Sequence, residues 1–146
     1  MLVDEIMPKA RARLVSISAG APVREAADLM SKPHTDLVVA CDAAGVMLGV
    51  LTKTDIVRYI RQCCDGGMAP VEMIMTRDVV SSKVGDVLRD VWNVMNERGL
   101  QRIPIIDDSR KPIGIVYARD ALQGLLGEAN DEDELLREYI GNTGYR

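Results

Sequence analysis

Apolar residues recur at helical spacing in two parts of the chain, residues 23–30 and 88–95. In each part they stand three or four positions apart, which predicts an amphipathic helix of about three turns. We expect Pro22 at the first position of the first helix and Asp86 as the N-cap of the second. The apolar positions are Val23, Ala26, Ala27 and Met30, and then Leu88, Val91, Trp92 and Met95.

Two short apolar runs follow each of these segments, separated by a four-residue turn. Short runs of β-forming residues at such a spacing are typical of β-hairpins. A second helix is expected after each hairpin, and a further short strand before each first helix. Each half is therefore predicted to run strand, helix, strand, strand, helix. The expected strands are 14–17, 37–41 and 46–51, and then 79–80, 103–106 and 113–116.

The two halves are copies of one sequence at an offset of 65 residues. Residues 15–57 align with 80–122 without a gap, and the leading segments 3–7 and 71–75 match at an offset of 68. Internal repeats of this kind indicate structural units that bury their apolar faces against each other. The predicted fold is α/β (α+β), with two β-α-β-β-α repeats packed with pseudo-twofold symmetry around a cleft. Eight pairs are identical: Val15, Ser16, Gly20, Arg24, Met30, Asp42, Gly49 and Asp55 with Val80, Ser81, Gly85, Arg89, Met95, Asp107, Gly114 and Asp120.

The expected organisation is a first repeat at 1–64, a linker at 65–70, a second repeat at 71–126 and an acidic tail at 127–146. The tail carries the whole net charge of −4, since residues 1–126 contain equal numbers of acids and bases. A short helix is expected in it, with Asp131 as N-cap and Gly141 as its end. We expect its apolar stripe to pack on the module or on a dimer partner, with a free tail or a dedicated partner-binding element as the alternatives.

Composition narrows the class of protein. The 146 residues are 47% hydrophobic and 27% charged, as in ordinary globular domains. A body without net charge gives little attraction for nucleic acid, which we do not expect as a partner. No apolar run approaches the roughly 20 residues of a membrane span. Three cysteines and an N-terminus without a signal-peptide pattern lead us to expect a cytoplasmic protein.

Two motifs extend this interpretation. Gly49-Val-Leu-Thr-Lys-Thr-Asp55 closes the first hairpin, and Arg102-Ile-Pro-Ile-Ile-Asp107 opens the second. With the duplication, residues 1–126 resemble a tandem pair of CBS domains, a Bateman module. The resemblance implies a stand-alone regulatory module without catalytic residues, metal or required cofactor. It implies binding of AMP, ADP, ATP or a related adenosyl compound between the copies, a homodimer, and signalling to an effector protein.

The resemblance also implies site residues. Thr52 and Asp55 would contact the ribose in one site, with Lys53 as a phosphate contact. Asp120 would serve the other site, with Arg119 beside it. Copy two has Tyr117 in place of the threonine, and copy one lacks the arginine and proline of the second motif, so we expect unequal sites. The pocket wall and the base contacts would come from Arg102 and Pro104, and from Ser16, Ile17, Ser81 and Ser82.

Structural interpretations compete with these roles. Thr52 and Asp55 also fit a capping box, in which each side chain bonds the other's backbone. Lys53 and Arg119 could be solvated, and Tyr117 could stack on a base or fill the pocket. The basic strip Lys9, Arg11 and Arg13 is expected to be a solvated linker, with a phosphate contact as the alternative. We expect His34 in a surface loop, and Cys63 and Cys64 as buried or idle thiols, with a redox switch as the alternative. We expect Met30, Met73, Met75 and Met95 as core or interface filler.

Two other functions are possible on the sequence alone. An assembly module with degenerate pockets would account for Tyr117 and for the incomplete motif of copy one. An enzyme is disfavoured, because no activated nucleophile, His–carboxylate pair or metal-ligand cluster is found.

Overall fold

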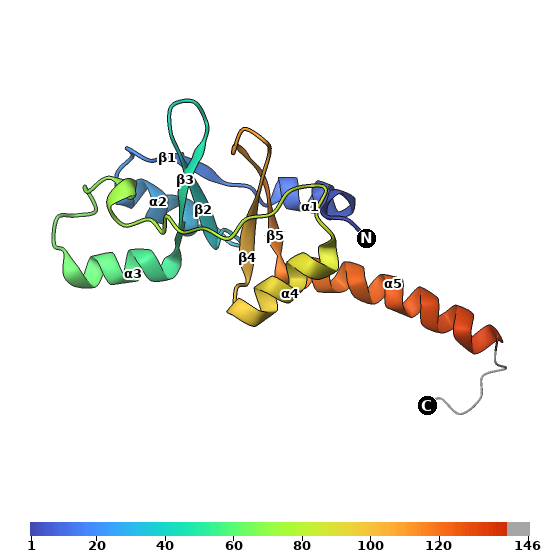
Figure 1. Ribbon diagram of the computed structural model, residues 1–146. Coiled ribbons are helices and arrows are strands. Elements are labelled where there is room, and N and C mark those ends of the chain that lie inside the picture. Colours follow the sequence, from blue (N-terminus) through green and yellow to red (C-terminus); the bar gives the residue numbers. More distant parts are fainter. Residues whose placement is uncertain (140–146) are drawn as a thin grey trace.

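The computed structural model describes the backbone of residues 1–139 and the side chains of residues 1–128. It has a mixed α/β fold of two similar halves (Figure 1). The first half contains β1 (Ser16–Ser18), α2 (Val23–Met30), β2 (Leu37–Cys41), β3 (Met47–Thr52) and α3 (Lys53–Gln62). The second contains α4 (Leu88–Arg98), β4 (Arg102–Ile106), β5 (Pro112–Tyr117) and α5 (Ala118–Tyr139). The leading segments hold the 3-10 helix η1 (Val3–Ile6), α1 (Met7–Ala12) and the 3-10 helix η2 (Val71–Met73).

The predicted duplication is present in the fold, because α2 and α4, β2 and β4, β3 and β5, and α3 and α5 all begin 65 residues apart. Both hairpins are antiparallel, and both shift register at the same place, between Ala40 and Cys41 and between Ile105 and Ile106. The turns are built alike as well. One carboxylate oxygen of Asp42, and one of Asp107, accepts two backbone N–H bonds of 2.9 Å within its turn.

The strand expected at residues 79–80 is absent. Its place is taken by an isolated bridge in which Ser82 pairs in parallel with Ile105. In the first half, β1 pairs in parallel with β2 over three residues, one to two positions later than the expected strand 14–17. A strand this short is defined by its pairing rather than by its own residues, so its position is poorly encoded locally.

Both predicted helix starts need correction. Pro22 has an extended backbone and is the N-cap of α2 rather than its first residue. The N-cap of α4 is Val87, and the Asp86 side chain instead accepts the N–H of Lys83. The N-terminal segment causes this second difference. The carbonyl of Met1 accepts the N–H of Leu88, which satisfies one of the free N–H groups at the start of α4.

The expected separate helix of the acidic tail is also wrong. A single helix, α5, continues through Asp131 to Tyr139 and extends away from the two sheets (Figure 1). Gly127 lies inside it and costs about 1 kcal/mol relative to alanine, which is too little to end a helix otherwise rich in good helix formers. Gly141 and the apolar stripe of the tail lie outside the residues and side chains described.

The leading segments are exchanged between the halves. In Figure 1 the N-terminal segment with α1 lies beside β5, away from β1. Val3 donates its N–H to the carbonyl of Asp86, and Leu2 forms a bridge with Val87. Conversely, the N–H groups of Val71 and Glu72 bond carbonyls of the first half. Each leading segment therefore completes the core of the other copy.

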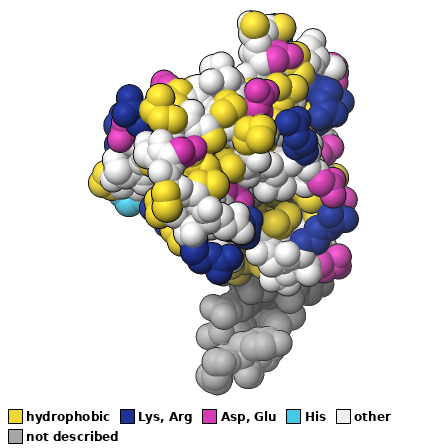
Figure 2. Space-filling model, turned by 90° about the vertical axis from the view of Figure 1, so that its left-hand side faces the viewer, with side chains coloured by type: hydrophobic (Ala, Val, Ile, Leu, Met, Phe, Trp, Pro, Cys, Tyr) yellow, Lys and Arg dark blue, Asp and Glu magenta, His cyan; other side chains and the backbone are white. Residues whose placement is uncertain are grey.

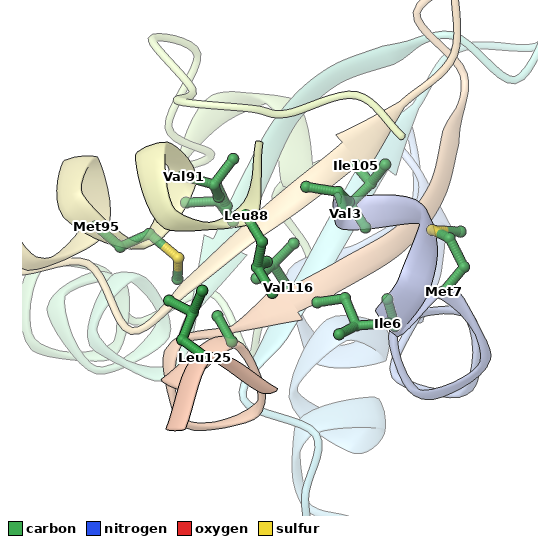
Figure 3. Packing of buried hydrophobic residues seen from close by; sticks show 12 residues of the cluster. Val3, Ile6, Met7, Leu88, Val91, Met95, Ile105, Val116 and Leu125 are labelled. Carbon is green, nitrogen blue, oxygen red and sulfur yellow. The ribbon is translucent and has the colours of Figure 1, made fainter. Parts of the chain in front are cut away.

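Two core clusters follow from the exchange. In the second half, Val3, Ile6 and Met7 from the N-terminal segment meet residues of α4, β5 and α5 (Figure 3). In the first half, Val71 and Met75 fill the equivalent place against α2, β2 and α3. The methionine prediction holds for Met30, Met75 and Met95, which are buried, but Met73 is 73% exposed.

A third cluster joins the halves through the hairpins. It includes pairs that match at the 65-residue offset, Cys41 with Ile106 and Val50 with Ile115. The expected packing of apolar faces is thus present, and it brings the ends of β3 and β5 together beside the helices that follow them. The cluster members are Leu37, Val39, Cys41, Met47, Val50, Ile106, Ile115 and Tyr117, flanked by Leu14 and Val79.

The exchange of the leading segments explains why the first motif has a glycine at position 49. A Cβ on Gly49 would lie 2.6 Å from the carbonyl oxygen of Thr76 and 2.8 Å from the Met75 side chain. Its counterpart Gly114 approaches the backbone of Ala10 in the same way, with the nearest atom at 3.0 Å. Each glycine lets a strand contact the exchanged segment of the other copy.

We therefore predict that Gly49→Ala lowers the free energy of unfolding by about 1–3 kcal/mol, because backbone on both sides must move. Urea denaturation of the whole chain measures it. Gly85→Ala is the control, since a Cβ there meets nothing within 4 Å. An equal effect of the two substitutions would contradict the explanation.

Candidate ligand site between the two copies

A cavity of about 370 Å³ lies where the two halves meet, and we call it the junction cavity. The first half contributes the start of β2 and the β3–α3 boundary, and the second contributes the turn between α4 and β4. The first residues of α3 present backbone N–H groups and the positive end of the helix dipole there, which favours an anion. The lining residues are Asp36, Leu37, Thr52, Lys53, Thr54, Gly99, Leu100, Gln101 and Arg102.

A three-membered ion cluster spans this cavity. Asp36 accepts from Lys53 Nζ at 3.0 Å on one carboxylate oxygen and from Arg102 Nη2 at 3.0 Å on the other. The hydrogen bond from Lys53 lowers the pKa of Asp36 most, and the charges of Arg102, Lys53 and His34 add to this, while partial burial opposes it. Lys53 and Arg102, expected only from the resemblance, are therefore brought together by a residue that the motifs do not include.

Tyr117 stands beside the cluster with three guanidinium groups around its ring. The guanidinium carbons of Arg13, Arg102 and Arg119 lie 4.1, 5.1 and 5.3 Å from the ring centroid, within cation–π range. The Tyr117 hydroxyl donates to the carbonyl of His34 at 3.0 Å. Tyr117 is 3% exposed, and both of its expected roles, stacking on a base and filling the pocket, stay predictions.

Asp120 is already paired. Arg13 donates to its two carboxylate oxygens through Nε and Nη2, both at 3.1 Å. Asp120 is 6% exposed, so this charge is removed from most of the solvent. The expectation of a solvated basic strip is therefore wrong for Arg13, although Lys9 and Arg11 are exposed. The exchange of the N-terminal segment places Arg13 here, at the end of α1.

Asp55 is engaged within its own helix. Its Oδ2 accepts the N–H of Thr52 at 2.9 Å and the Thr52 hydroxyl at 3.2 Å, and Oδ1 lies 3.5 Å from Arg58. Asp55 is 8% exposed and Thr52 lines the junction cavity. The capping interaction that competes with ligand contact is thus present at α3, and the ligand role of both residues stays a prediction.

The other expected contacts lie apart from the junction cavity. Ile17 belongs to the core cluster of the first half, Pro104 is fully buried, and Ser16 is exposed. Ser81 and Ser82 line a separate hollow of about 240 Å³ against α4, where the buried Ser82 hydroxyl has no hydrogen-bond partner. Their roles toward a base are not tested by this geometry.

Three further findings bear on which ligands and surroundings the described residues suit. On the face drawn in Figure 2, basic and acidic side chains alternate with hydrophobic ones and no broad basic surface is present. Within the described residues, no group of three or more His, Cys, Asp or Glu side chains could hold a metal ion. Among the same residues, no helix combines the length and apolar character needed to cross a bilayer.

The comparison with known families decides the identity of the fold. The model of the CBS domain matches twice, at residues 3–62 and 71–127. The chain belongs to the CBS domain family. One relative of this CBS pair is the CBS domain-containing protein YhcV of Bacillus subtilis, which is 31% identical over 74% of this chain and 76% of its own. Other relatives, such as an L-aspartate semialdehyde sulfurtransferase, are longer, and the CBS pair spans about a fifth of their length.

Solved CBS pairs have the same architecture. The CBS domain pair of protein MJ0100, in complex with 5′-methylthioadenosine and S-adenosyl-L-methionine, has a TM-score of 0.73 at 24% identity, covering 88% of this chain and 98% of that one. The protein CBSX2 in complex with AMP has a TM-score of 0.73 at 20% identity, with the same coverage of each chain. At these identities the likeness establishes the fold.

Sequence reasoning missed two residues of the charged region, Asp36 and Arg13. Asp36 had a detectable signal, because its counterpart in the second copy is Gln101, and the counterparts of Lys53 and Arg102 are Ala118 and Leu37. Three charged residues thus break the repeat symmetry near the same strand ends. Arg13 had no comparable signal, since its partner lies 107 residues away.

The Arg13–Asp120 pair gives a stability prediction. Replacing Arg13 with methionine leaves a buried carboxylate without its bidentate partner, and we expect the free energy of unfolding to fall by about 1–3 kcal/mol. Arg11→Met, on the exposed side of the same helix, is the control. Adding Asp120→Asn to Arg13→Met should recover part of the loss, and a double variant as unstable as the sum of the single ones would contradict the pairing.

The Asp36 cluster gives a pH prediction. Because the folded-state pKa of Asp36 lies below its ordinary value of 3.8, its stabilisation is present above that value and is lost as the pH falls through the folded pKa. Asp36→Asn should therefore cost less than about 1 kcal/mol at pH 7, because the pair is partly exposed. The difference from wild type should shrink as the pH falls below about 4. Urea denaturation at pH 7 and at low pH checks this, and a difference that grows on acidification would refute it.

Proposed function

We propose that this CBS pair is a non-catalytic regulatory module that binds an adenine nucleotide or a related adenosyl compound between its copies. Ligand binding shifts the packing of the two copies, and a homodimer passes this shift to an effector protein in the cytoplasm. A ligand can do so only by its difference in affinity for the two arrangements. The binding of AMP, 5′-methylthioadenosine and S-adenosyl-L-methionine by CBS pairs of the same fold supports the ligand class.

The junction cavity is the observation that carries this proposal. It has polar and cationic groups from both copies, and Lys53, Arg102 and the start of α3 together suit an anionic group. Asp55 and Asp120 supply carboxylates of the kind that bind paired ribose hydroxyls, although each now has a protein partner.

A second candidate is an assembly module that binds no ligand. Two observations favour it: Arg13 occupies both oxygens of Asp120, and Tyr117 closes the neighbouring space with its bond to His34. In that case the charged residues at the junction would only hold the copies together.

Thermal and chemical denaturation with AMP, ADP, ATP, NAD and S-adenosylmethionine distinguishes the two functions. A ligand at 100 times its dissociation constant should add about 2.7 kcal/mol to the free energy of unfolding. Absence of any shift with all five compounds at millimolar concentration would favour the assembly module. Turnover of a nucleotide by the purified protein, abolished by Asp55→Ala, would instead overturn the non-catalytic assignment.

A lysine pair provides a matched variant. Lys53 and Lys83 are 56% and 54% exposed, and each contacts one aspartate at 3.0 Å, but only Lys53 lines the junction cavity. We predict that Lys53→Met weakens binding of the phosphorylated ligand on the order of tenfold, the equivalent of one charge-assisted hydrogen bond. Lys83→Met should leave the dissociation constant unchanged, and isothermal titration calorimetry compares the two.

A further inference from the structure

The arrangement around Asp36 resembles an anion already bound in the junction cavity. Its two carboxylate oxygens take one cation each, Lys53 from the first copy and Arg102 from the second, at 3.0 Å. Asp36 itself lies in the loop before β2 and is about one quarter exposed, so it reaches the cations from the rim of the cavity. A phosphate group with two free oxygens would meet the same two donors.

The repeated fold does not require this cluster. The counterpart of Asp36 is Gln101, which precedes β4 in the same way and also lines the cavity. The second copy makes the same turn and strand without a carboxylate at that position, and the counterparts of Lys53 and Arg102 are the uncharged Ala118 and Leu37. The ion cluster is therefore an addition to one side of the pseudo-twofold axis, which separates it from the needs of the hairpin itself.

The cations are not fully satisfied by Asp36. Arg102 Nε is buried and has no hydrogen-bond partner, and Arg119 lies near the same tyrosine ring as Arg102. One carboxylate carries a single negative charge, whereas a phosphate monoester carries about −1.5 to −2 at neutral pH and offers three acceptor oxygens. Such a group would match Lys53 and Arg102 better than Asp36 does, in both charge and number of acceptors.

We propose that Asp36 is an internal competitor for the phosphate of the ligand, and that binding exchanges its carboxylate for that phosphate on Lys53 and Arg102. This inference rests on the proposed function and adds a regulation to the same site. It assigns the cavity to phosphorylated adenosyl ligands, since 5′-methylthioadenosine has no group that could displace Asp36.

Replacement of the Asp36 carboxylate by a phosphate would also change the contacts of the loop before β2, and so couple ligand binding to the protein's conformation. Asp36 follows His34 by two residues, and His34 has a left-handed backbone with φ of 69°, which is uncommon outside glycine. The loop is held by the two ion pairs of Asp36 and by the bond from Tyr117 to the His34 carbonyl. Removing Asp36 from its cations takes both ion pairs from this loop and leaves it the tyrosine bond and the 3.4 Å bond from the Thr35 N–H to the Lys32 carbonyl.

The test compares Asp36→Asn with wild type by isothermal titration calorimetry at fixed ionic strength, using AMP, ATP and 5′-methylthioadenosine. We expect Asp36→Asn to tighten AMP and ATP binding by about three- to tenfold, because the competing charge is gone. Binding of 5′-methylthioadenosine should stay unchanged. Asp108→Asn is the matched control, since it removes the same charge from an exposed residue that contacts only Lys83 among the described ion pairs.

Each outcome tests either the competitor role of Asp36 or the proposed function. Equal affinity of wild type and Asp36→Asn for AMP and ATP would refute the competitor role and leave the proposed function standing. An equal gain for 5′-methylthioadenosine, or with Asp108→Asn, would show that phosphate is not what Asp36 opposes. No binding of any of the three compounds to either protein would overturn the proposed function together with the inference. Should Asp36→Asn unfold, Asp36→Gln carries the test, because glutamine stands at the matching position 101.

Discussion

The exchange of leading segments is the constraint on which the rest of the structure depends. A unit of about 60 residues buries too little apolar surface to be very stable alone. Here neither copy has a complete core of its own, because Val3, Ile6 and Met7 belong to the core of the second half and Val71 to that of the first. The same exchange sets the contacts of Gly49 and Gly114 and brings Arg13 to Asp120.

The two sides of the pseudo-twofold axis have diverged within this common frame. On one side Arg13 and Tyr117 occupy the space next to Asp120. On the other side Lys53 is paired with Asp36, and both residues line the junction cavity. The two copies place different side chains at their strand ends, and this difference gives a physical basis for expecting unequal sites. The ion pair on the first side is largely buried and the one on the second is partly exposed, so the second costs less to separate.

The elements that depend on local pattern were the predictable ones. The helical spacing at 23–30 and the apolar runs of the hairpins place α2, β2, β3, β4 and β5 to within about a residue, and the spacing at 88–95 places the start of α4, because side-chain periodicity specifies them. The wrong predictions at Asp86 and at residues 79–80 involve long-range contacts, whereas the continuous α5 reflects local helix propensity. Asp86 is not the cap since Met1 serves Leu88, and the second copy pairs at Ser82 because β4 accepts it there. Lys53 and Arg102 were found through motifs, whereas Asp36 and Arg13 acquire their roles only in three dimensions.

The exchange also limits how this CBS pair can move. Opening the two halves like a hinge would pull η1 and α1 out of one core and η2 out of the other, which exposes apolar surface on both sides at once. The hairpin cluster that includes Cys41, Ile106, Val50 and Ile115 also connects the halves, but it contains no exchanged segment. The packing of the leading segments therefore disfavours hinge opening and favours small sliding of one hairpin over the other, a shear type of motion. Under the proposed function, an effector protein would therefore respond to shifts at the hairpin surfaces rather than to a wide opening of the two copies.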